Sequence, residues 1–238
     1  MVAKIVNSLF FILMVHLSMA QESKTSTIGN IGLAIGNSQG SFTADYFHNW
    51  MIGKNHKIEI GIGARFTSYF GSSQHYSTAP AKITTGSTGP GVLFKEAITQ
   101  NIDSFLLKTP QVNLLNIALN LGYRISSKWG AGFSIDLIGF SFGDEKSGKY
   151  INSQQSSNVS GKPTPFNALL IGDNDHGSLN SEFYLRYFLQ DRWAIKAGFQ
   201  YLFTEFTTDT EVQQLPESND RFRNKSSLLS IGVSHKLK

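Results

Sequence analysis

The chain has 238 residues with a formal net charge of +4, of which 16% are charged and 12% aromatic, with 22 glycines and no cysteine. A mean hydropathy of −0.14 excludes a bundle of transmembrane helices, and the lack of cysteine excludes disulfides. The mild basicity gives no reason to expect a nucleic-acid partner. Low charge with many glycines and aromatic residues favours an all-β chain.

The N-terminus predicts a secretory signal peptide over residues 1–20. Lys4 supplies a positive charge, residues 5–17 form an apolar run, and Ser18-Met19-Ala20 places small residues before a cleavage site. The run is short for the alternative, an uncleaved anchor helix. The mature chain then begins at Gln21, carries a formal charge of +3, and forms one domain over residues 21–238.

Eight strands follow in chain order, each marked by alternation of apolar and polar residues. The third is the clearest, since isoleucines at positions 58, 60 and 62 alternate with charged residues and glycines. In the fifth the alternation slips near Leu137 or Gly139, which predicts a β-bulge. The eight segments are 30–36, 42–50, 57–67, 115–124, 129–142, 182–189, 193–204 and 229–237.

The connections alternate in length. Three or four polar residues join strands two and three, four and five, and six and seven, whereas residues 71–108, 143–177 and 207–225 form long loops. Tryptophan collects at membrane interfaces, and Trp50, Trp129 and Trp193 all lie beside short turns on the apolar face. The pattern predicts an all-β, eight-stranded antiparallel up-and-down transmembrane β-barrel with short periplasmic turns and long outer loops. An outer aromatic girdle is expected at Tyr69, Phe70, Phe140, Phe142 and Phe206.

The polar face of the strands indicates which side is the lumen. It is rich in glycine, alanine, serine and asparagine, which suit a narrow interior, while the apolar face carries the large residues that suit lipid. The alternative is a soluble barrel with the opposite orientation. With lipid outside, the single charges of the polar face form a salt-bridge network in the lumen, at Asp45, Lys57, Glu59, Arg65, Arg124, Asp136, Glu182, Arg186 and Lys196.

The architecture and the last strand, Ser230 to Leu237, resemble the small eight-stranded outer-membrane barrels typified by OmpA and OmpX. The resemblance covers about residues 26–238. The last strand departs from the family's terminal signal, because His235 stands at an apolar position and the chain ends in Leu237-Lys238 without an aromatic residue. The resemblance implies insertion into a Gram-negative outer membrane by the barrel assembly machinery, with outer-membrane lipid around the barrel.

These features predict a non-enzymatic barrel that acts through its surface loops, or as a subunit of an envelope assembly. An envelope protein or surface ligand is expected to bind at loops 71–108, 143–177 and 207–225. Residues 71–91 are expected to be mobile, and residues 92–107 to form either a short amphipathic helix or an extension of a hairpin.

Two alternatives remain open, a lipid-modifying enzyme of the deacylase or acyltransferase class and a narrow channel. His75-Tyr76-Ser77 is similar to the His-x-Ser pair of outer-membrane lipid A deacylases, but continued alternation points both side chains inward and no acidic partner can be assigned. Asp173 to Gly177 resembles the start of a calcium loop, although Tyr184 stands where the closing glutamate is expected. No cofactor or metal is expected.

Overall fold

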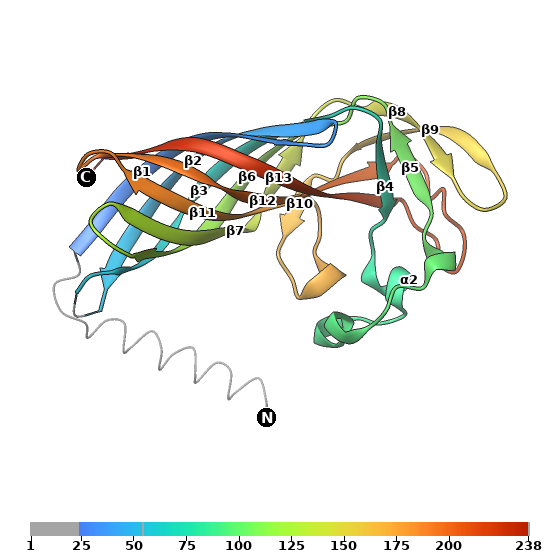
Figure 1. The fold of residues 1–238 in the computed structure, drawn as a ribbon. Coiled ribbons are helices and arrows are strands. Elements are labelled where there is room, and N and C mark those ends of the chain that lie inside the picture. The colour runs from blue at the N-terminus through green and yellow to red at the C-terminus, as the bar shows by residue number, and fades with distance from the viewer. Residues whose placement is uncertain (1–23, 54, 238) are drawn as a thin grey trace.

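The computed structural model describes residues 24–53 and 55–237. The predicted signal peptide lies outside the described residues. Within these described residues, thirteen strands form one antiparallel sheet whose pairing runs round in a ring (Figure 1). Eight long strands build the barrel, and these are β1 (Lys24–Gly36), β2 (Gln39–Ile52), β3 (Ile58–Gly71), β6 (Gln111–Arg124), β7 (Trp129–Phe142), β11 (Leu179–Phe188), β12 (Trp193–Thr208) and β13 (Arg221–Lys236).

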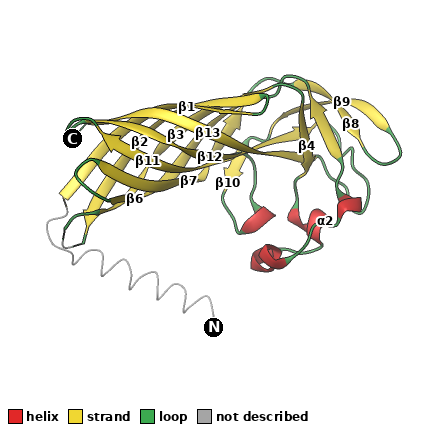
Figure 2. Ribbon diagram, viewed as in Figure 1, coloured by secondary structure: helices red, strands yellow, loops and turns green. Residues whose placement is uncertain are grey.

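The expected count of eight strands is wrong, because segments expected to be loops contain five further strands. These are β4 (Gln74–Thr78), β5 (Ser104–Leu107), β8 (Lys146–Ile151), β9 (Ser156–Pro163) and β10 (Phe166–Ala168). The same segments hold the short helix α2 (Ala81–Thr85) and the short 3₁₀ helices η1 (Gly89–Phe94), η2 (Thr99–Asn101) and η3 (Gly172–Asn174), coloured red in Figure 2. Within the described residues, no helix is long and apolar enough to cross a membrane.

The long strands pair round in a closed cycle, β1–β2–β3–β6–β7–β11–β12–β13 and back to β1. The predicted bulge in the fifth barrel strand is confirmed. Ile117 pairs with Ile138 whereas Ala118 pairs with Asp136, so Leu137 is the extra residue. The short connections between β2 and β3, between β6 and β7, and between β11 and β12 lie at the same end of the barrel as the described start of β1 and the end of β13 (Figure 1).

A second, smaller cycle of strands extends the sheet beyond the long-loop end. β12 pairs with β9, β9 with β8, β8 with β5, β5 with β4, and β4 with β13, while β12 and β13 also pair with each other. We call these six segments the outer ring. It shares the β12–β13 ribbon with the barrel, and most of residues 71–108 and 143–177, which were expected to form loops, lies in strands and short helices.

Residues 92–107 form neither the amphipathic helix nor the extended hairpin of β3 and β6 that the sequence left open. η1 and η2 precede β5, which pairs with β4 and β8 instead of with the barrel strands. The apolar residues of this stretch divide accordingly, because Phe105 is fully buried in the outer ring while Phe94 is 89% exposed.

Candidate functional site

The barrel buries polar side chains and exposes apolar ones. Strand β3 illustrates this, because Glu59 and Arg65 are 4% and 1% exposed whereas Ile58 and Ile62 are 43% and 45% exposed. Since successive side chains of a strand point to opposite faces, the polar set lines the lumen and the apolar set covers the outside. Most of the length of the eight barrel strands follows this rule, with inward apolar exceptions such as Ile28, Phe47 and Leu114, so the barrel has the opposite arrangement to a water-soluble one.

Arg65 lies at the centre of the lumen between two carboxylates. Its Nη1 donates to Asp136 at 3.3 Å and to the carbonyl of Asn180 at 3.0 Å, and its Nε lies 3.8 Å from Asp45. Its other terminal nitrogen donates to the hydroxyl of Ser134. Asp136 also accepts from the Asn116 amide at 2.7 Å and from the Asn180 backbone N–H at 3.0 Å. Fully buried charges need this degree of compensation, because desolvating each one costs several kcal/mol.

Two further ion pairs lie in the lumen. Arg186 donates to Glu59 at 2.6 Å and to the Tyr184 hydroxyl at 3.1 Å. Lys196 donates to Glu182 at 2.8 Å. The structure therefore brings seven of the nine predicted lumen charges into three clusters, as Asp45–Arg65–Asp136, Glu59–Arg186 and Glu182–Lys196.

The other two predicted charges, Lys57 and Arg124, lie apart from this network. The backbone N–H of Arg124 donates to the Lys57 carbonyl at 2.7 Å, which holds both residues at the short-turn end. The Arg124 guanidinium stacks on the ring of Phe188 at 3.9 Å. Among residues 24–53 and 55–237, no ion pair includes either cation.

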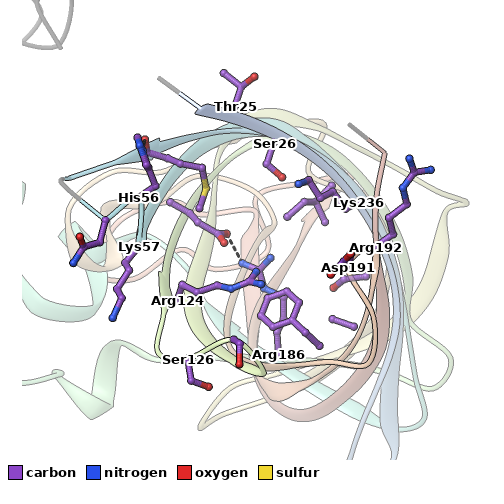
Figure 3. A pocket seen from close by; sticks show the side chains of 18 residues that line it. Thr25, Ser26, His56, Lys57, Arg124, Ser126, Arg186, Asp191, Arg192 and Lys236 are labelled. Carbon is purple, nitrogen blue, oxygen red and sulfur yellow. Dashed lines mark hydrogen bonds and ion pairs between the residues drawn. The ribbon is translucent and has the colours of Figure 1, made fainter. Parts of the chain in front are cut away.

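Lys57 and Arg124 line an open cavity of about 700 Å³ at the short-turn end of the lumen. Figure 3 shows the side chains of Arg124 and Arg186 reaching towards the middle of this opening. Beyond the ion pair of Glu59 with Arg186, the next cavity has a volume of about 10 Å³. That is about the smallest space that holds a water molecule, so side chains fill the lumen directly behind the mouth.

The outer half of the lumen and the outer ring share an apolar core. Four inward apolar side chains lie on the long-loop side of the charged clusters, and these are Tyr69, Leu114, Leu202 and Leu228. They pack continuously with the core of the outer ring, which contains Tyr76, Phe105, Leu107, Tyr150, Phe206 and Phe222. Ring centroids lie 5.2 Å apart between Tyr76 and Phe206, and 5.8 Å apart between Phe105 and Phe222. The space is tight, since a Cβ on Gly148 would lie 2.6 Å from Phe105.

The expected outer girdle is therefore wrong at Tyr69 and Phe206, both fully buried in this core. Because side chains alternate along a strand, Tyr69 points inward next to the outward Phe70, and Phe206 points inward three residues after the outward Phe203. The alternation along the strand, and not the aromatic character of the residue, therefore determines which face these side chains occupy. Phe70, Phe140 and Phe142 are exposed, at 51%, 64% and 52%. At the other end Trp50, Trp129 and Trp193 are all half exposed on the outer surface, at 39%, 47% and 44%.

A charged cluster that sequence reasoning missed lies on the outer face of the β12–β13 ribbon. Glu205 is fully buried and accepts from Arg221 at 2.8 Å and from Arg223 at 2.7 Å. Its backbone N–H donates to the Ser178 hydroxyl at 3.0 Å. Burial alone raises the pKa of a carboxyl, but the two guanidinium groups and their hydrogen bonds hold the pKa of Glu205 below its usual 4.5. The sequence did contain a signal for this cluster. Glu205 is a charged residue at an outward position of β12, directly after the last exposed apolar residues of that strand.

The two sequence motifs that suggested chemistry, residues 75–77 and 173–177, lie outside the lumen clusters. His75 and Ser77 lie on β4 and are exposed, which corrects the expectation of inward-pointing loop residues; His75 Nδ1 lies 2.8 Å from the Ser104 hydroxyl. In segment 173–177, the Asp175 side chain accepts from the Leu170 N–H at 2.7 Å, and His176 Nδ1 lies 2.9 Å from the Phe166 carbonyl. Across the described part of the chain, no group of three or more His, Asp or Glu side chains is placed to hold a metal ion.

No protein-family model matches the chain, and no curated protein matches it in sequence. Its fold is similar to that of Ail, the attachment invasion locus protein of Yersinia pestis, at 10% identity over 91% of this chain and 100% of that one, with a TM-score of 0.35. Neisserial surface protein A is similar at 10% identity over 90% and 96%, with a TM-score of 0.34. The N-terminal β-barrel domain of Pseudomonas aeruginosa OprF is similar at 9% identity over 91% and 100%, with a TM-score of 0.34. These neighbours are outer-membrane β-barrels, and the likeness concerns the fold alone.

Proposed function

We propose that this chain is an integral, non-enzymatic outer-membrane protein whose eight long strands cross the bilayer and whose outer ring is a rigid recognition surface. The observation that carries the proposal is the exposed apolar belt around a closed strand cycle with a charged interior. A closed barrel satisfies every backbone polar group internally, which a lipid-facing sheet requires. In water, such a belt would be a large aggregation surface.

The height of the belt fits a membrane. On β12 the outward residues are apolar from Trp193 to Phe203, and the next outward residue is Glu205. About ten residues at about 3.3 Å each, tilted by about 40°, rise about 25 Å along the barrel axis, which is the height of the apolar band in outer-membrane barrels. The tryptophans then mark the periplasmic interface, and Glu205 lies beyond the opposite one.

The filled lumen supports a closed barrel rather than a channel. The open mouth ends at the pair of Glu59 and Arg186, and the apolar core fills the opposite half. We expect no ion conductance above the membrane baseline in planar bilayers. Steady single-channel steps from the pure protein would instead support the narrow channel.

The outer ring suits recognition because it presents polar surface on a rigid core. The β8–β9 connection and its neighbours, residues 152–158, are mostly exposed serine, glutamine and asparagine. Asn152 orders this turn by accepting from the backbone N–H groups of Gln154 and Gln155 at 2.9 and 2.8 Å. Such a surface binds a protein or glycan without first ordering a loop.

Single-cysteine labelling of whole cells tests the topology, because the native chain has no cysteine. Ser157→Cys in the outer ring should react with a membrane-impermeant maleimide, and Ser127→Cys in a short turn should react only after the outer membrane is permeabilised. A protein recovered in the soluble fraction, or equal labelling of both variants in intact cells, contradicts the proposal. Heat-dependent migration on a gel after detergent extraction checks the barrel itself.

The lipid-modifying enzyme has one feature in its favour, the exposed pair of His75 and Ser104. It lies on the outer ring rather than on the apolar belt, where a lipid substrate would approach. Lipid A mass spectrometry with and without the gene decides this alternative. A change in acylation that is lost in His75→Ala would overturn the non-enzymatic proposal.

A further inference from the structure

An exposed apolar patch stands beside the outer end of the barrel. Two segments far apart in sequence form it, residues 89–94 and residues 169–172, which we call the apolar foot. Its exposed side chains are Leu93 at 62%, Phe94 at 89%, Leu170 at 54% and Ile171 at 49%. Figures 1 and 2 show these segments standing out to the side of the barrel axis rather than continuing along it.

The two segments hold each other in place. The Asn174 amide donates to the Gly89 carbonyl at 3.0 Å, and Val92 is buried between the segments. Gly172 has a φ of +63°, and a Cβ there would lie 3.3 Å from Leu93 and 3.6 Å from Val92. The exposed apolar side chains therefore belong to a folded junction, which presents them in a fixed arrangement.

The wall of the barrel sets the height of the foot. β10 pairs with the outer end of β7, Phe166 with Phe140 and Ala168 with Ile138, and the next N–H, of Leu169, donates to the Leu137 carbonyl at 2.7 Å. Leu137 lies eight residues above Trp129, so Leu169 leaves the wall about 20 Å above the level of that tryptophan, within an apolar band about 25 Å tall. The foot therefore starts at the outer edge of the belt.

The apolar surface is continuous from the belt to the foot. Phe140 belongs to the belt, and its ring lies 6.4 Å from that of Phe166, from which the chain runs on to Leu170 and Ile171. Lys95, directly after Phe94, is exposed. Aromatic and aliphatic residues followed by a basic residue are typical of segments that rest at the boundary between acyl chains and headgroups.

We propose that the apolar foot inserts into the outer leaflet of the membrane that surrounds the barrel, with Leu93 and Phe94 among the upper acyl chains and Lys95 at the headgroup phosphates. The inference rests on the proposed function, because it needs the belt to lie in lipid. The occupant of this surface is then lipid, and the contact fixes the outer ring relative to the membrane, since η1 leads through η2 into β5.

Depth-dependent quenching in lipid vesicles tests the foot. The cysteine-free chain permits three single-cysteine variants, each labelled with an environment-sensitive fluorophore: Phe94→Cys in the foot, Ile231→Cys in the belt, and Ser157→Cys in the outer ring as the polar control. Phe94→Cys should be quenched by lipids with a nitroxide near the headgroup at least about twofold more than Ser157→Cys. Ile231→Cys should be quenched most by a nitroxide in the middle of the acyl chain.

The outcomes separate the foot from the barrel. If Ile231→Cys is quenched while Phe94→Cys behaves like Ser157→Cys, the foot is refuted and the barrel stands. If Ile231→Cys escapes quenching, the transmembrane barrel itself fails. If Phe94→Cys is unquenched and cross-links efficiently to a second copy in the vesicles, the patch is a contact between copies of this chain and the lipid proposal is overturned.

Discussion

Replacing Arg65 by methionine should be among the most destabilising single changes in the lumen. The guanidinium is fully buried and faces two carboxylates, Asp136 at 3.3 Å and Asp45 at 3.8 Å. Breaking a buried ion pair from one side costs about 3–5 kcal/mol, because the remaining charge is left without compensation. Asp136 keeps two N–H donors after the substitution, which lowers the free-energy cost. Asp45 is the second carboxylate left without its cation, which raises that cost. We expect a loss of about 4 kcal/mol in the free energy of unfolding.

Urea unfolding of the protein in lipid vesicles measures this loss, with tryptophan fluorescence as the readout, since all three tryptophans lie on the outer surface. Lys57→Met is the matched control, because it removes an exposed cation at the cavity rim and should cost less than about 0.5 kcal/mol. Arg65→Met with Asp136→Asn removes one orphaned carboxylate and should recover about half of the loss. A loss below about 1 kcal/mol for Arg65→Met, or a double variant less stable than the single one, would refute the reasoning.

Three further predictions concern other parts of the molecule. Because the folded pKa of Glu205 is lowered, its stabilisation is complete above its usual value of 4.5 and is lost as pH falls below it, so proteolysis of the outer ring should increase in that range, and Glu205→Gln should remove this pH dependence. Gly63→Ala should destabilise the barrel by about 1–3 kcal/mol or more in urea titrations, because the new Cβ would lie 1.9 Å from a backbone oxygen, whereas Gly91→Ala meets no atom within 4 Å and should be neutral. Phe222→Ala should cost the outer ring about 3–5 kcal/mol, seen as cleavage within residues 152–158 while the heat-dependent gel shift of the barrel persists.

The barrel could be predicted from the sequence because its two faces differ chemically at every second residue. The strands of residues 57–67 and 193–204 alternate with few exceptions, and a one-residue slip would place charges in lipid, so their register has little freedom. Even the bulge at Leu137 left a signal, since the apolar parity changes after it. The same parity placed seven of the nine predicted charges in the lumen clusters, but it did not predict which of them would pair.

The outer ring could not be predicted in this way. Its strands β4, β5, β8 and β9 have only four to eight residues. In β8 and β9, Gly148 and Gly161 occupy positions against Phe105 where a larger residue does not fit, so these two strands lack a clean alternation of apolar and polar residues. β8 and β9 form a local hairpin, but the pairings that close the ring are non-local, since β5 meets β8 across about forty residues and β9 meets β12 across a similar interval. Only tertiary contacts determine which strands pair, so the sequence showed polar loops.

Along the β12–β13 ribbon, the inner and outer faces exchange their apolar and polar character where the barrel meets the outer ring. This change relates the barrel, the outer ring and the foot to one another. Parity does not change along β12, since Lys196, Leu202 and Phe206 all point inward. The surroundings change instead. Below Leu202 the inner face of β12 carries Lys196 and Gln200 and its outer face is apolar. Around Glu205 the inner face of the ribbon carries Phe206 and Phe222, and its outer face carries Glu205, Arg221 and Arg223.

A strand that leaves lipid can make this exchange, because its apolar side chains are then covered by protein while its outer face carries charges that are paired, as Glu205 is with Arg221 and Arg223. In the proposed membrane placement, the crossover between Leu202 and Glu205 marks the outer boundary of the bilayer independently of the tryptophans. It agrees with the rise of about 25 Å from Trp193. The foot leaves the wall near the same level on β7, which is why its exposed leucine and phenylalanine side chains are best explained by contact with lipid.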